Sequence, residues 1–178
     1  RRVLFRSASL RNELNSVANL SGDVNINTSA LQKSLVALNQ QFGTSTMMSG
    51  ELLKDFTRLT EVAGYSADAA AGLSRITVAT GTDLSKNTEA ILGEAAALNA
   101  VNGLALNEKQ IVEEVAKASA ATTLSLGMQP KELAKAVVES KALGASLQEV
   151  EQISQQLLQF ESSIGNELEA ELLTGKDL

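Results

Sequence analysis

Acidic side chains near the C-terminal end of the chain are the residues whose type could support catalysis or metal binding. Two carboxylates that face each other across a substrate can hydrolyse a glycoside when an apolar pocket raises one pKa. In a helix, however, Glu167 and Glu171 lie one turn apart beside a leucine stripe, and Glu169 points well away from both. We therefore expect these carboxylates to form the polar border of a packed helix and not a catalytic pair. The stretch FESSIGNELEAELLTGKDL, residues 160–178, contains the carboxylates Glu161, Glu167, Glu169, Glu171 and Asp177 among Ile164, Leu168, Leu172 and Leu173.

Some residue types are absent from the chain, and their absence limits the reactions and metal sites that it could support. The 178 residues include no Cys, no His and no Trp. Without His there is no Ser-His-Asp relay and no Glu-x-x-His di-metal site, and without Cys there is no thiolate nucleophile or sulfur ligand for zinc. We expect no catalytic, cofactor-binding or metal-binding residue in this chain, and no enzyme activity.

The other candidate groups have structural interpretations as well. The pairs Glu113–Glu114 and Glu149–Glu151 fit solvated helix faces, as the C-terminal glutamates do. The turns GLALNEK and GTDLSK lack the G-x-x-x-x-G-K-S/T spacing of a phosphate loop. The pair Met47–Met48 could form a soft binding surface, but two Met residues near a helix start are more often core filler.

Composition and charge exclude two classes of partner. Hydrophobic residues make up 44% of the chain but aromatic residues only 3%, which favours elongated helical packing over a thick core. The net charge is −6 and no run of Lys or Arg is present, which argues against nucleic-acid binding. No apolar stretch approaches the roughly 20 residues that a membrane-spanning helix needs. The most Ala-rich region, Ala95–Ala105, is interrupted by polar residues and Gly.

Glycines followed by helix-capping residues divide most of the chain. Gly64, Gly81, Gly103, Gly127 and Gly144 each come after a helical pattern, where Gly suits a left-handed backbone position. Capping chemistry follows each of them. The predicted caps are Ser66, Asp83, Asn107 with Gln110, Ser146 with Glu149, and Pro130 as a first helical residue.

Apolar residues between these turns recur at helical spacing, and no window alternates as a strand does. We predict an all-α fold of short amphipathic helices joined by Gly-containing tight turns, in an elongated array or bundle. The clearest stripe has a coiled-coil-like spacing of threes and fours. It consists of Leu147, Val150, Ile153, Leu157, Phe160 and Ile164, and continues to Leu168 and Leu172.

Three segments differ in character along the chain. Residues 1–7, RRVLFRS, match what the end of a common short-read sequencing adapter encodes, so we expect an artefact there and leave them out of the fold prediction. Residues 8–49 form a polar, Asn- and Ser-rich N-terminal segment in which we expect one short helix. Residues 50–178 are predicted to be a multi-helix array. We expect the chain to be a metagenomic fragment, truncated at both ends.

Residues 50–178 resemble the tail tape measure proteins of environmental, especially marine, bacteriophages. The similarity lies in the glycine-punctuated residues 64–137 and 141–178, and most specifically in the ending FESSIGNELEAELLTGKDL. The resemblance implies a long, largely helical structural protein that occupies the lumen of the tail tube and sets tail length. It also implies partners: sister copies, as a homo-oligomer, and tail tube or tail assembly proteins. The implied location is the virion, after synthesis in the bacterial cytoplasm.

Two further functions remain open from the sequence. One is a lytic module that cleaves peptidoglycan with glutamates from separate helices, and it requires two carboxylates across an open cleft. The other is a helical protein-binding array, which the uneven glycine spacing disfavours. For the tape measure function we expect Leu157→Asp to abolish folding or assembly of its segment.

Overall fold

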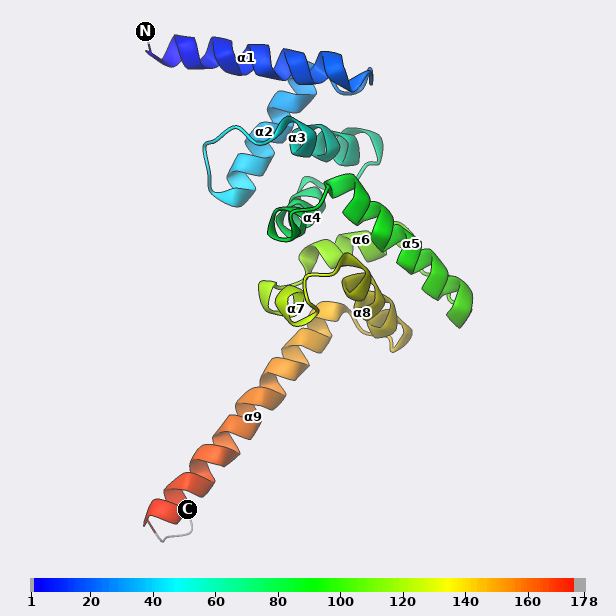
Figure 1. Ribbon diagram of the computed structural model, residues 1–178. Coiled ribbons are helices and arrows are strands. Elements are labelled where there is room, and N and C mark those ends of the chain that lie inside the picture. The colour runs from blue at the N-terminus through cyan, green and yellow to red at the C-terminus, as the bar shows by residue number, and fades with distance from the viewer. Residues whose placement is uncertain (1, 175–178) are drawn as a thin grey trace.

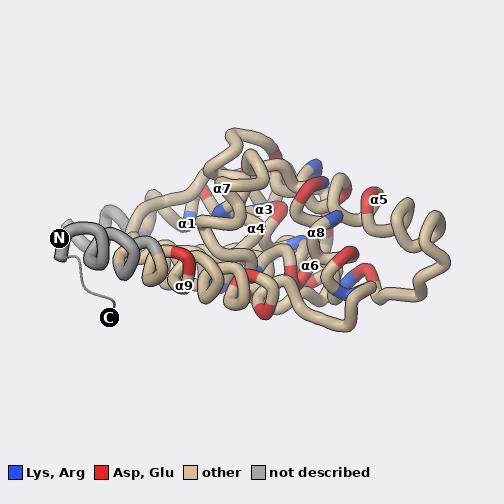
Figure 2. Tube along the Cα trace, turned by 90° about the horizontal axis from the view of Figure 1, so that it is seen from below, with Lys and Arg blue, Asp and Glu red and all other residues tan. Residues whose placement is uncertain are grey.

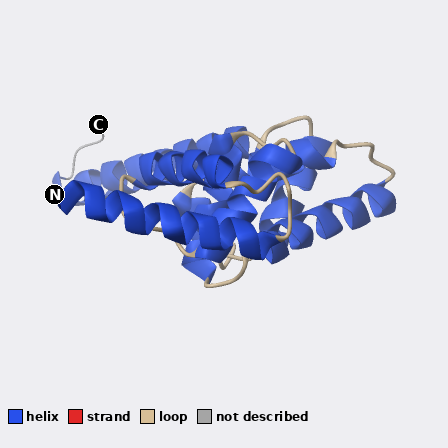
Figure 3. Cartoon of the chain, turned by 90° about the horizontal axis from the view of Figure 1, so that it is seen from above, coloured by secondary structure: helices blue, strands red, loops and turns tan. Residues whose placement is uncertain are grey.

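The regular structure of this chain is entirely helical in the part that the structure describes. This computed structural model describes the backbone of residues 2–174 and the side chains of residues 8–164 and of residue 166. No strand occurs within these limits (Figure 3), which confirms the all-α prediction. The elements are α1 (Arg2–Ser21), α2 (Thr28–Phe42), α3 (Gly50–Thr57), the π-helical turn η1 (Arg58–Val62), α4 (Ala67–Thr80), α5 (Leu84–Asn102), α6 (Glu108–Lys117), α7 (Ala120–Ser125), α8 (Pro130–Ala142) and α9 (Leu147–Thr174).

Local hydrogen bonds explain where α4 and α6 begin. The hydroxyl of Ser66 accepts the Ala69 N–H at 3.2 Å. The side-chain oxygen of Asn107 accepts the N–H groups of Lys109 and Gln110 at 2.9 and 3.3 Å. These bonds satisfy backbone donors that have no partner within the first helical turn. The predicted N-caps Ser66 and Asn107 are confirmed.

The sequence predicts the first residue of α8 correctly, but it does not predict how the start of α5 is capped. Pro130 begins α8, where its missing N–H costs nothing, as predicted. Asp83 precedes α5, but its side chain makes no capping hydrogen bond and pairs with Lys86 at 2.7 Å instead. A carboxylate oxygen of Asp55, on α3, accepts the Ser85 N–H at 3.4 Å. The first turn of α5 is therefore capped from another helix.

Glycines with left-handed backbone end several of the helices, α4 and α5 among them. Gly81 follows α4 with φ 67°, and Gly103 follows α5 with φ 64°. A side chain at such a φ would bring Cβ close to a carbonyl oxygen, which is why Gly is favoured there. The turn after each helix sends the chain back toward the same stack.

The helices are stacked along one long axis, with α1 at one end and α9 at the other (Figure 1). α1 packs on α2 and α3, α4 packs on α6, and α5, α6 and α8 pack on one another. Small and aliphatic side chains fill the spaces between layers, and Phe56 is the largest of the fully buried ones. The core runs through the stack from α1 to the start of α9. Its members include Leu14, Leu31, Leu38, Leu53, Phe56, Leu73, Ile91, Val112, Leu133 and Leu147.

The crossing of α4 and α6 is unusually close. A Cβ atom placed on Gly72 would lie 2.1 Å from the carbonyl oxygen of Ala116. Only a residue without a side chain fits between the two backbones. Ala116 itself is 4% exposed, so the contact lies inside the core.

The N-terminal segment differs from the prediction. Residues 8–49 contain most of α1 and all of α2, where the sequence analysis expects one short helix. Leu31, Leu35 and Leu38 lie three and four residues apart on one face of α2 and are buried, while Gln32, Lys33 and Gln40 are exposed. Amphipathic spacing outweighs the Asn- and Ser-rich composition here because burial of one face is sufficient to hold a helix. α1 begins at Arg2, so the helix also includes residues that the fold prediction leaves out.

Candidate functional site

α9 begins in a capping box, as the sequence predicts. The Ser146 N–H and hydroxyl donate to one carboxylate oxygen of Glu149 at 2.7 and 2.8 Å, and the Glu149 N–H donates back to the Ser146 hydroxyl at 3.2 Å. The hydrogen bonds from Ser146, that of the backbone N–H first, lower the pKa of Glu149 below its ordinary value. This carboxylate thus positions the start of α9 and is not free for catalysis.

Only the first turn of α9 belongs to the stack. Leu147 is buried, and a carboxylate oxygen of Glu151 accepts the Ser119 N–H at 3.2 Å, which ties α9 to the start of α7. From Gln152 to Ile164 every side chain is exposed. α9 therefore extends away from the other helices, as Figure 1 shows.

The predicted apolar stripe lies open along this extension. Its described members beyond the first turn are Ile153, Leu157, Phe160 and Ile164, which we call the α9 stripe; they are 55%, 62%, 65% and 41% exposed. Because Leu157 is exposed and is not part of the described core, we expect Leu157→Asp to act on assembly rather than on folding. Its effect on assembly stays a prediction. A stripe of this kind is normally covered by a partner surface.

The C-terminal carboxylates do not form a described site. Glu161 is exposed, and the side chains of Glu167, Glu169 and Glu171, like those of Leu168, Leu172 and Leu173, lie outside the part that the structure describes. Asp177 lies outside the described residues altogether. Where side chains are described, no three His, Cys, Asp or Glu residues are grouped as metal ligands.

In the pair Glu113–Glu114, Glu114 holds two helices together through an ion pair. One carboxylate oxygen of Glu114 pairs with the ammonium group of Lys141, and both side chains are partly buried. The other oxygen of Glu114 is buried without a hydrogen-bond partner among the described atoms. The ion pair links α6 to the last turn of α8. Of the pair Met47–Met48, Met48 is half-buried against the core, as core filler would be, whereas Met47 is exposed.

One small pocket does bring carboxylates together. It has a volume of about 230 Å³, lies between α3 and the α4–α5 turn, and is lined by Glu51, Asp55 and Asp83 among other residues. Asp55 caps α5 through Ser85, and Asp83 is paired with Lys86. Two of the three carboxylates are thus engaged in holding α5, which leaves no facing pair of the kind that glycoside hydrolysis requires.

A larger groove lies between α4, α6 and α7. Its volume is about 490 Å³, within the roughly 300–1,000 Å³ of ordinary binding pockets. Two cationic side chains, Arg75 and Lys117, line it, and no Asp or Glu does. We call it the α4–α7 groove. Its lining consists of Gly72, Arg75, Ile76, Ala79, Ala116, Lys117, Ala118, Ser119, Ala120, Thr123, Leu124 and Met128.

The sequence alone does not indicate this groove, because its lining comes from three separate helices. One local signal is visible only in the structure: Met128 has φ 54°, a left-handed conformation that is uncommon for a residue other than Gly. It directly follows Gly127, with φ 65°. Backbone strain of this kind is concentrated at binding and switch sites.

Comparisons with known proteins do not assign this chain to a family. No family model, curated protein sequence or solved structure matches this chain. Among its described residues, no helix has the length and hydropathy needed to cross a membrane. Among the surfaces of the described residues, the α9 stripe and the α4–α7 groove bear most directly on function.

Proposed function

We propose that this chain is a segment of a phage tail tape measure protein, a structural component that helps set tail length and occupies the tail tube lumen before ejection. One observation supports the proposal most. A stack of small helices along a single axis continues into a long helix whose apolar stripe is left uncovered (Figure 1). A helix of this kind suits contacts with sister copies or with the wall of a tube. The sequence resemblance of residues 50–178 points in the same direction.

The mechanism would be geometric. A helix converts chain length into distance at about 1.5 Å per residue, so the 28 residues of α9 alone correspond to about 42 Å. Contacts made by the apolar stripe of α9 would hold neighbouring chains along the tube axis. In this proposal no residue acts as a catalyst, and the partners are sister copies together with tail tube or tail assembly proteins in the virion.

A lytic function is supported less well. Its best location would be the pocket lined by Glu51, Asp55 and Asp83, where two carboxylates already serve α5. No described feature favours a concave solenoid surface either. We therefore propose a non-enzymatic role.

Tail length tests the proposal directly. In a phage that carries this gene, a tandem duplication of residues 8–174 should lengthen the tail by up to about 250 Å if the added residues run as helix along the tube. Electron microscopy of purified virions measures the change. Neighbouring tail-tube and tail-assembly genes on the same contig would support the same conclusion.

A matched control keeps the residue number constant. Leu157→Asp in the same gene adds no residues, so particles that assemble should keep the original tail length. Unchanged tails in the duplication mutant, with the longer product present in virions by mass spectrometry, would contradict the proposal.

A further inference from the structure

The net charge of the chain is concentrated in α9. Fourteen basic and fourteen acidic residues precede Leu147, so that part of the chain is neutral overall. α9 contains six glutamates and neither Lys nor Arg, and Lys176 and Asp177 balance each other after it. Figure 2 shows acidic positions on the described part of α9. α9 as a whole therefore carries all of the chain's excess negative charge, and the part of it that leaves the stack also carries the apolar stripe.

In the part of α9 whose side chains are described, Glu161 borders the α9 stripe closely. At helical spacing, Glu161 lies about 40° around the helix from Leu157, just beside the stripe. Glu161 and Leu157 are both exposed. A surface that covers the stripe must therefore also accommodate negative charge at its edge, and it should be apolar in the middle and basic at the rim.

The α4–α7 groove has this combination. Ile76, Ala118 and Leu124 contribute apolar lining, and Leu124 is 63% exposed. Arg75 and Lys117 are exposed, and neither forms an ion pair with any residue that the structure describes. Charged groups that are already paired elsewhere would offer little attraction, whereas these two are available.

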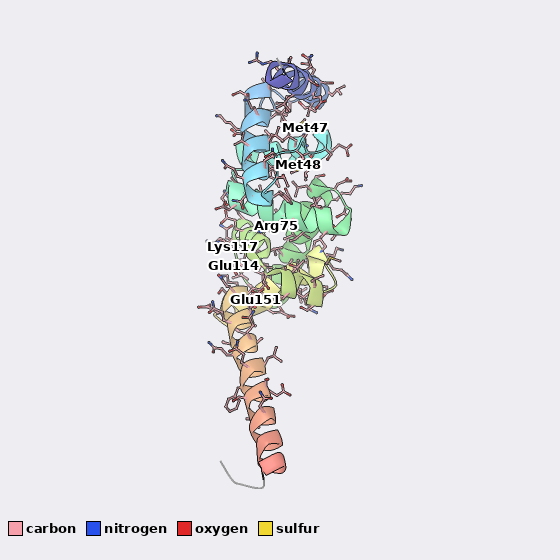
Figure 4. All side chains as sticks on the ribbon, turned by 90° about the vertical axis from the view of Figure 1, so that its left-hand side faces the viewer. Met47, Met48, Arg75, Glu114, Lys117 and Glu151 are labelled. Atoms are coloured by element: carbon pink, nitrogen blue, oxygen red, sulfur yellow. The ribbon has the colours of Figure 1, made fainter. Side chains whose placement is uncertain are left out.

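Two carboxylates occur on the same side of the stack as these cations but have partners of their own. Figure 4 shows Arg75, Lys117, Glu114 and Glu151 in sequence along that side. Glu114 is paired with Lys141, and Glu151 accepts the Ser119 N–H. The groove therefore keeps its positive character beside them.

The occupant of the groove cannot be the α9 stripe of the same chain. α9 is one continuous helix that points away from the stack (Figure 1), so its stripe cannot fold back without breaking the helix. Pairing of α9 with α9 from a second copy is disfavoured, because it would bring two helices of six glutamates together without a compensating cation.

We propose that the α4–α7 groove of one copy of this chain binds the α9 stripe of a second copy. The contact joins two different surfaces, so it is heterologous, and each bound copy presents a further groove and a further stripe. Copies are therefore added head to tail, in an open line or a closed ring according to the rotation between neighbours. The proposal rests on these two surfaces and holds whether or not the chain belongs to a phage tail.

A mixing experiment with two full-length variants tests it. Leu157→Asp damages the stripe and leaves the groove intact, while Arg75→Glu with Lys117→Glu reverses the groove and leaves the stripe intact. Sedimentation velocity should show concentration-dependent association of the wild-type chain. Each variant alone should associate at least about tenfold more weakly. Their mixture should form a one-to-one dimer that does not extend, since one good groove and one good stripe remain.

The controls concern folding and net charge. All three altered side chains are exposed, so circular dichroism melts should match the wild type. Arg75→Ala with Lys117→Ala provides a milder groove variant. Lys33→Glu with Lys131→Glu makes the same change in net charge outside the groove and should leave association unchanged.

Several outcomes would overturn the proposal. A wild-type chain that stays monomeric at every concentration would do so, as would a groove variant that associates like the wild type. A variant mixture without the dimer would also contradict it.

Ionic strength gives an independent test on the unaltered chain. Association between acidic and basic surfaces should weaken as salt rises from about 0.01 M to about 1 M, because the screening length falls from about 30 Å to about 3 Å. Pairing of two acidic helices should instead strengthen, because salt screens their repulsion. Association that strengthens with salt would rule out the groove as the binding surface.

Discussion

At the scale of single residues, the carboxylates of this chain serve mainly to hold helices in place. Glu149 closes the capping box of α9, Asp55 caps α5 from a neighbouring helix, and Glu114 pairs with Lys141. Each of these arrangements satisfies backbone donors or a nearby cation. These three carboxylates are better understood as elements of helix positioning than as catalytic groups.

The pKa of Glu149 provides a residue-scale prediction. Both hydrogen bonds from Ser146 favour the ionised carboxylate, and the backbone N–H contributes more than the hydroxyl. Ser146→Ala removes only the hydroxyl, so it should raise the pKa of Glu149 part of the way back to its ordinary value. A carbon-detected NMR titration of that carboxyl measures the change.

The same shift has a consequence for stability against pH. Because the pKa of Glu149 is lower in the folded chain than in the unfolded one, its contribution is present above the unfolded pKa. It is lost as the pH falls through the lowered folded pKa. Glu149→Gln should remove this part of the acid sensitivity at the α8–α9 junction. If Ser146→Ala left the pKa of Glu149 unchanged, the Ser146 hydroxyl would not be a cause of the lowered pKa.

At the scale of elements, two glycines within helices have opposite roles. Gly72 allows α4 to cross α6 at close range, since a Cβ there would lie 2.1 Å from the Ala116 carbonyl oxygen. Gly93 is exposed on α5, and a Cβ there would meet nothing within 4 Å. The same substitution is therefore expected to have opposite signs at the two positions.

We predict that Gly72→Ala lowers the free energy of unfolding by roughly 1–3 kcal/mol, because α4 and α6 must move apart. Gly93→Ala should raise it by roughly 0.5–1 kcal/mol, because alanine restricts the unfolded chain and favours helix. Urea unfolding followed by circular dichroism measures both. Equal effects at the two sites would show that the close crossing does not limit α4–α6 packing.

At the scale of the whole molecule, the core ends where α9 leaves the stack. Leu133 is fully buried on α8, whereas Leu157 on α9 is 62% exposed. Leu133→Asp places a carboxylate in the core and should cost more than about 4 kcal/mol, enough to unfold the chain. Leu157→Asp should change the unfolding free energy by no more than about 0.5 kcal/mol.

Thermal melts at a concentration where the chain is monomeric compare these two variants. The same Leu→Asp change is made at both sites, so only the environment differs. If both variants melted early, α9 would have to pack on the stack in solution. That result would remove the exposed stripe on which the proposed assembly depends.

Local features of this fold were predictable from the sequence alone. Ser66, Asn107, Pro130 and the Ser146–Glu149 box appear as predicted because a cap involves residues within three or four positions of one another. The all-α class follows from the same short-range periodicity. Asp83 is the exception, since Asp55 from another helix competes for the first turn of α5.

Burial and surface pairing were decided only by the tertiary structure. The spacing of Ile153, Leu157 and Phe160 predicts a stripe, but it cannot tell whether another helix covers that stripe. The α4–α7 groove depends on residues from 72 to 128 meeting in space. The sequence determines what each helix offers on its faces, because those interactions are local. Which faces meet is determined by packing between distant segments. In the described part of the chain, packing leaves the apolar α9 stripe and the α4–α7 groove with its two cations uncovered.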